Sequence, residues 1–84
     1  MDKNITIKNN IRELRFFADE MTQKELAEKA GVSRQTIIAI EAGKYNPSLK
    51  LAFQIADVFG KELTEVFTYE KTELKNSSEE QKNE

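Results

Sequence analysis

Few residues in this 84-residue chain could carry out catalysis. The sequence contains no cysteine and no histidine, so it lacks a thiolate nucleophile and the side chain that most often acts as a general base. A metal site would have to use oxygen ligands alone. The adjacent carboxylates Asp19 and Glu20 have no nucleophile or metal ligand placed near them in the sequence. We therefore expect a protein that is not an enzyme and that has no cofactor and no metal.

A different chemistry is indicated by the consecutive polar residues Ser33, Arg34 and Gln35. In the major groove of DNA, arginine recognises guanine and glutamine recognises adenine, and each good pairing contributes about 1–3 kcal/mol of discrimination. On a helix that begins here, Ile38 has two interpretations: it contacts a thymine methyl group, or it lies at the rim of the core. The predicted base-reading set is Ser33, Arg34, Gln35, Ile38 and Ala39.

Helix start and stop signals define the two elements that must position these residues. Thr22 and Glu25 form a capping box, which predicts a helix over residues 23–30 that stops at Gly31. Ser33 is a good N-cap for a second helix, which ends near Gly43. Two helices joined by a short turn that contains glycine form a helix-turn-helix.

Similar signals predict three further helices, so we expect an all-α fold of five helices around one core. After Asn10, one helical face carries Ile11, Leu14, Phe17, Ala18 and Met21. A fourth helix follows Pro47 and ends at Gly60, and a short turn of helix spans residues 62–66. Residues 5–7 and 66–69 read instead as candidate short terminal strands, which pair with each other, pair across a dimer axis, or remain extended arms.

Composition and charge divide the chain into three parts: an N-terminal arm at 1–9, a domain at 10–70 and a disordered polar tail at 71–84. Residues 1–70 hold ten basic and eleven acidic side chains, so a nucleic-acid binder must concentrate its positive charge locally. The apolar runs are too short for a membrane helix, and the first ten residues lack the apolar stretch of a secretion signal. We expect no membrane association and a cytoplasmic location.

At these motifs the sequence resembles the Cro/CI helix-turn-helix family, also called lambda-repressor-like or Xre. The likeness covers residues 10–67 and is carried by IRELR, TQKELAEKAGVSRQTIIAIEAGKYNPS and LAFQIADVFGKELTEVF. It implies a five-helix DNA-binding domain of the small stand-alone type, whose third helix enters the major groove. The connection at 15–21 is one residue longer than the family's usual spacing, so either the first helix is extended or its turn is bulged.

The resemblance also assigns roles outside the recognition helix. It places Gln23 on a DNA phosphate, as its position at a helix N-terminus also allows. It further implies an internal ion pair between Glu41 and an arginine of the first helix, Arg15 or Arg12. The predicted phosphate-contacting set is Thr22, Gln23, Thr36, Lys44, Tyr45 and Asn46.

One such domain covers only part of a DNA site, which favours a two-fold dimer on a palindromic operator. The predicted dimer interface is Glu62, Val66, Phe67 and Tyr69. We expect a sequence-specific transcriptional regulator that acts as a repressor, with double-stranded DNA as its partner and no small-molecule effector. The alternative is an antitoxin-like or accessory protein-interaction module built on the same fold.

Overall fold

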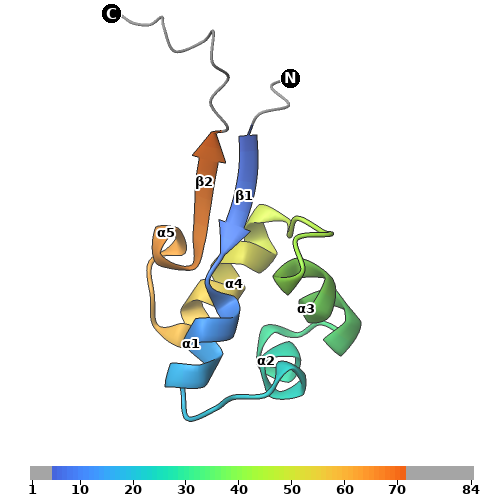
Figure 1. Cartoon of the computed structure of the whole chain (residues 1–84). Coiled ribbons are helices and arrows are strands. Elements are labelled where there is room, and N and C mark those ends of the chain that lie inside the picture. Colours follow the sequence, from blue (N-terminus) through green and yellow to red (C-terminus); the bar gives the residue numbers. More distant parts are fainter. Residues whose placement is uncertain (1–4, 72–84) are drawn as a thin grey trace, which may run out of the picture.

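The computed structural model describes residues 5–71 (Figure 1). Its elements are β1 (Ile5–Asn9), α1 (Ile11–Phe17), α2 (Gln23–Ala30), α3 (Arg34–Glu41), α4 (Leu49–Phe59), α5 (Leu63–Val66) and β2 (Phe67–Lys71). The five predicted helices are confirmed. The two candidate strands pair with each other, so the fold is a five-helix domain with a two-stranded sheet rather than strictly all-α. Within residues 5–71, no helix is long and apolar enough to span a membrane.

The helix-turn-helix is formed by α2 and α3, and its ends are capped as the sequence predicts. Thr22 Oγ1 accepts a hydrogen bond from the Glu25 amide at 3.0 Å, and Glu25 Oε1 accepts one from the Thr22 amide at 2.9 Å. Gly31 ends α2 in the left-handed conformation, with φ 75°. Ser33 Oγ then accepts from the Thr36 amide at 3.2 Å and starts α3. These caps fix where the recognition helix begins.

A single apolar core joins all five helices. Its fully buried large side chains are Ile11, Leu26, Ile37, Ile40, Ile55 and Val66. Small residues, among them Ala27 and Ala30 on α2, let the helices approach closely. No polar or charged side chain among the described residues is buried in this core.

The two strands form an antiparallel ribbon that projects from the helices (Figure 1). Ile7 pairs with Tyr69 on one face, and Thr6 pairs with Glu70 on the other. On the polar face Lys8 Nζ lies 2.8 Å from a Glu70 carboxylate oxygen, and this hydrogen bond raises the pKa of Lys8 above its usual value. The ribbon therefore has one polar and one apolar face.

The strand boundaries differ slightly from those predicted. Val66 belongs to α5 rather than to a strand, and Lys71, assigned to the tail, is the last residue of β2. Residues 5–9 of the predicted arm form β1. The rest of the predicted tail, residues 72–84, lies outside the described residues.

Two asparagines anchor the ribbon and α1 to the bundle. Asn9 Nδ2 donates to the Ile40 carbonyl at 3.0 Å, and its Oδ1 accepts from the Ile11 amide at 3.1 Å. Asn10 Nδ2 donates to the Glu65 carbonyl at 3.1 Å. Asn9 thus accepts a hydrogen bond from the first amide of α1, whose N-cap is Asn10, and holds the C-terminal end of α3, a role that helix signals alone did not indicate.

The predicted apolar face of α1 is wrong at its C-terminal end. The helix stops at Phe17, whose side chain is 79% exposed, and Met21 lies beyond the helix in the connection to α2. Asp19 and Glu20 adopt left-handed backbone conformations with φ 63° and 56°. These two residues turn the chain, so the longer connection is a bulged turn and not an extension of α1.

Candidate nucleic-acid interface

The start of α3 presents the predicted base-reading residues to the surface. Ser33, Arg34 and Gln35 are exposed. Ile38 is 37% exposed and Ala39 is half-buried, because the opposite side of α3 packs into the core. An arginine, a glutamine and an aliphatic side chain therefore share one open helix surface, as recognition of base edges requires.

The hydroxyl groups of Ser33 and Thr36 engage each other. Their oxygen atoms are 3.0 Å apart, and Ser33 Oγ also accepts the Thr36 amide hydrogen. Ser33 thus has a structural function as N-cap besides its predicted place beside the groove. Thr36, predicted to contact phosphate, is half-buried.

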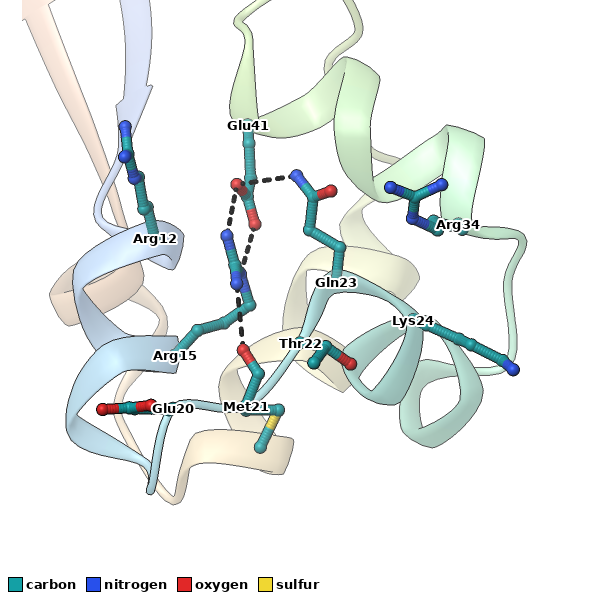
Figure 2. A pocket seen from close by; sticks show the side chains of 9 residues that line it. All are labelled: Arg12, Arg15, Glu20, Met21, Thr22, Gln23, Lys24, Arg34 and Glu41. Atoms are coloured by element: carbon teal, nitrogen blue, oxygen red, sulfur yellow. Dashed lines mark hydrogen bonds and ion pairs between the residues drawn. The ribbon is translucent and has the colours of Figure 1, made fainter.

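A two-pronged ion pair ties α3 to α1 (Figure 2). Arg15 Nε donates to Glu41 Oε2 at 2.7 Å, and Arg15 Nη2 donates to Glu41 Oε1 at 3.0 Å. The side chains are only 16% and 10% exposed, which shields the pair from water. Arg15 Nη1 also donates to the Met21 carbonyl at 2.9 Å and so holds the bulged turn. Of the two arginines that the resemblance allowed, Arg15 is the partner of Glu41.

Gln23, the first residue of α2, joins the same network. Its Nε2 donates to Glu41 Oε1 at 3.2 Å (Figure 2). The half-buried side chain is therefore oriented by α3 while its backbone lies at the N-terminus of α2. The contact connects the predicted phosphate-binding position to the recognition helix.

A hollow surrounds this network between α1 and the starts of α2 and α3 (Figure 2). It is lined by Arg12, Arg15, Glu20, Met21, Thr22, Gln23, Lys24, Arg34 and Glu41. Within residues 5–71, no ion pair is formed by Arg12, Lys24 or Arg34, whereas Glu41 is neutralised by Arg15. Three cations and one carboxylate, Glu20, thus line the hollow without an ion pair among the described residues, beside a helix N-terminus that itself favours anions.

Arg12 and Lys24 were not predicted from the sequence as members of this group. Lys24 directly follows Gln23, and Arg12 lies one helical turn before Arg15. Once Arg15 was known to pair with Glu41, these two sequence relationships could have indicated that Arg12 and Lys24 lie beside the hollow. The remaining predicted phosphate contacts, Lys44, Tyr45 and Asn46, are exposed in the loop after α3.

One member of the predicted dimer interface is corrected. Val66 is fully buried in the core of its own chain, where it cannot meet a partner, because α5 turns this residue inward. Tyr69 is 61% exposed, Phe67 is half-buried and Glu62 is exposed. These three residues remain available on the surface.

Comparison with known proteins agrees with this geometry. A family model described as helix-turn-helix matches residues 11–66. An uncharacterized HTH-type transcriptional regulator of Methanocaldococcus jannaschii is 55% identical over 67 residues, which cover 80% of this chain and all of that protein. A second, from Archaeoglobus fulgidus, is 54% identical over 54 residues, or 64% of this chain and 76% of its own length. A third, YgzD of Bacillus subtilis, is 44% identical over 64 residues, or 76% of this chain and 96% of its own length.

The family match covers the whole α1–α5 unit, including the ion pair and the recognition helix. The relative from M. jannaschii is matched along its full length. The chain therefore belongs to the helix-turn-helix family, as a small member of the Xre-like type that its sequence resembles.

Proposed function

We propose that this protein is a sequence-specific DNA-binding transcriptional regulator of the cytoplasm that reads an operator with α3. The observation that carries the proposal is the surface of α3, where Arg34, Gln35 and Ile38 are open to solvent while the rest of the helix is locked to the domain. A base-reading helix must be held rigidly because each contact depends on bidentate geometry. The names of the relatives, all HTH-type transcriptional regulators, support the same function.

The hollow around the Arg15–Glu41 pair supports a backbone contact beside the recognition helix. A phosphate at the start of α2 would meet the amide end of the helix and the Gln23 carboxamide, with Arg12 and Lys24 on opposite sides of Gln23 and Glu20 also in the lining (Figure 2). Such contacts set the position of a domain on DNA but do not read its sequence. Lys44, Tyr45 and Asn46 would contact the backbone at the other end of α3.

We further propose a homodimer that binds a palindromic operator. The apolar face of the ribbon continues into a groove whose lining includes Ile7, Pro47, Leu49, Leu63, Phe67 and Tyr69. Leu49 is 68% exposed and Tyr69 is 61% exposed, so one surface offers both a projecting ring and an apolar depression. A two-fold dimer needs this self-complementarity, because the same patch is used by both copies.

Two features favour this groove over other surfaces as the dimer face. A two-stranded ribbon is marginal alone and gains stability when its apolar face is covered. The groove is lined by the ribbon, α4, α5 and the loop before α4, which includes the proposed phosphate contact Asn46, but by no residue of α3, so α3 stays open toward DNA. Two copies could then place their recognition helices in half-sites about one helical turn, ~34 Å, apart.

Among regulatory outcomes, repression requires the fewest contacts beyond DNA binding from such a small domain. Occupying an operator that overlaps a promoter blocks transcription without any further contact. An antitoxin-like or accessory module is the alternative function, and it would bind a protein instead of DNA as its main target.

A fluorescence-anisotropy titration of a labelled random-sequence duplex at two salt concentrations separates these functions. A DNA-binding regulator binds the duplex and loses affinity steeply as salt rises, because phosphate contacts release counterions. Absence of binding even at low salt would overturn the proposal and favour the protein-interaction module. Sedimentation velocity of the same sample tests the dimer, and a monomer throughout the micromolar range would remove that part of the proposal.

A further inference from the structure

Two neighbouring phenylalanines at the end of α1 are exposed on a surface that the proposed function does not use. Phe16 is 62% exposed and Phe17 is 79% exposed. Their rings meet edge to face, with centroids 5.3 Å apart, and so form one aromatic patch. Exposed apolar side chains that cluster, unlike single ones, mark interaction sites.

The patch lies at the end of the molecule opposite the ribbon (Figure 1). A dimer formed through the ribbon groove would therefore leave Phe16 and Phe17 uncovered. Neither residue lines the hollow beside α2, although Phe16 lines an adjoining one that shares Arg12, Arg15, Glu20 and Met21 with it. The two proposed contacts, with a second copy and with DNA, thus do not account for this patch.

Negative charge lies on the side of the bulged turn that follows the aromatic pair, whereas on α1 Phe16 lines a hollow with Arg12 and with Arg15, which is paired to Glu41. Asp19 and Glu20 follow the two phenylalanines in the bulged turn, where both side chains are exposed. Next to the turn, a shallow hollow is lined by Ala18, Asp19, Met21, Glu25, Glu28 and Lys29, with one cation against three carboxylates. Within residues 5–71, no ion pair engages Asp19, Glu20 or Glu28. Carboxylates without partners beside an apolar patch attract cations and repel phosphate.

We propose that this aromatic–acidic surface, defined by Phe16, Phe17, Asp19 and Glu20, docks a basic segment of a partner protein. The segment would carry lysine or arginine on either side of an aliphatic or aromatic side chain that packs on the two phenylalanine rings. Charge favours this occupant over a second copy, which would set the carboxylates of its own turn against these carboxylates, and neither the two rings nor Asp19 lines the hollow proposed for phosphate. The inference is independent of whether the domain binds DNA.

Selection of peptides from a random phage-displayed library on the full chain tests this surface. The enriched peptides are then synthesised and titrated against wild type, Phe16→Ser/Phe17→Ser and Asp19→Asn/Glu20→Gln. Phe53→Ser, on α4, is the matched control because this phenylalanine is 54% exposed but distant in sequence from the patch. All substituted side chains are exposed, so circular dichroism should show a folded domain in every case.

We expect peptides that combine basic residues with an apolar anchor. Their affinity should fall about ten-fold or more in the Phe16→Ser/Phe17→Ser variant and also fall in Asp19→Asn/Glu20→Gln, but stay unchanged in Phe53→Ser. Duplex DNA binding should be the same in wild type, Phe16→Ser/Phe17→Ser and Phe53→Ser; Asp19→Asn/Glu20→Gln is left out of this comparison because Glu20 also lines the hollow beside α2. The proposal is overturned if no peptide is enriched, if enriched peptides bind all variants equally, or if Phe16→Ser/Phe17→Ser changes the sedimentation coefficient, which would assign the patch to a second copy.

Discussion

Arg15 and Glu41 are 26 positions apart in sequence, yet they form a two-pronged ion pair with distances of 2.7 and 3.0 Å. The pair joins α1 to the C-terminal end of α3 and also binds Gln23 at the start of α2 through Glu41. One carboxylate therefore connects the recognition helix, the proposed phosphate contact and the first helix. This network fixes the relative positions of the groups that would meet DNA.

Replacing Glu41 with alanine should destabilise the domain by about 3 kcal/mol, because the Arg15 guanidinium would lose its partner in a largely shielded site. Urea denaturation followed by circular dichroism measures the change, which is large for a domain of this size. Arg12→Ala is the matched control and should have little effect, since no ion pair within residues 5–71 involves Arg12. Arg15→Met/Glu41→Leu should recover much of the loss. Equal stability of Glu41→Ala and wild type would contradict the structural role.

The phosphate contact can be tested through salt dependence. Lys24→Ala should weaken binding to every duplex alike and lower the slope of log affinity against log salt by about 0.9, the value for one phosphate contact. Lys29→Ala, at the other end of α2 and away from the hollow, is the charge-matched control and should leave the slope unchanged. An identical slope in Lys24→Ala and wild type would show that the hollow does not contact the backbone.

The ribbon offers a matched pair of substitutions for the dimer. Ile7→Lys places a charge on the apolar face that lines the groove, whereas Thr6→Lys adds the same charge on the polar face opposite Glu70. We expect Ile7→Lys to sediment as a monomer and to bind a palindromic duplex more weakly, while Thr6→Lys remains a dimer. If both variants form dimers of equal stability, the dimer interface lies on a surface other than the apolar face of the ribbon.

The sequence predicted the helix-turn-helix well because its determinants are local. Thr22, Glu25, Gly31 and Ser33 act within four residues of the groups they cap, so their spacing alone indicates where α2 and α3 begin and where α2 ends. The prediction of which α3 residues point away from the core followed from helical periodicity, which is also a local property. Arg15 as the partner of Glu41 came only from the family resemblance, which left Arg12 open as an alternative.

Several features that depend on tertiary contacts were not predicted. Asn9 holds the end of α3 through a hydrogen bond across 31 residues, which no local pattern indicates. Periodicity placed Phe17 and Met21 on one helical face, because nothing local marked Phe17 as the end of α1. The cations Arg12 and Lys24 were missed because the hollow exists only after three helices have packed together.

Gly31 provides a test of the turn itself. Its φ of 75° is strained for a residue with a Cβ atom, although a Cβ there would meet nothing within 4 Å. Gly31→Ala should therefore cost about 1 kcal/mol through backbone conformation alone, measured by thermal unfolding. Gly31→Asn should cost less, since asparagine tolerates the left-handed region better. An alanine variant as stable as wild type would show that the backbone relaxes to another conformation.

Reading of a DNA sequence by α3 is tested most directly by selection of bound duplexes from a random pool at about 0.15 M salt. Wild type should enrich a palindromic motif, and Arg34→Ala/Gln35→Ala should lose it while remaining folded, because both side chains are exposed. Sequence reading by α3 is contradicted if wild type enriches no motif, or if the Arg34→Ala/Gln35→Ala variant enriches the same motif as wild type.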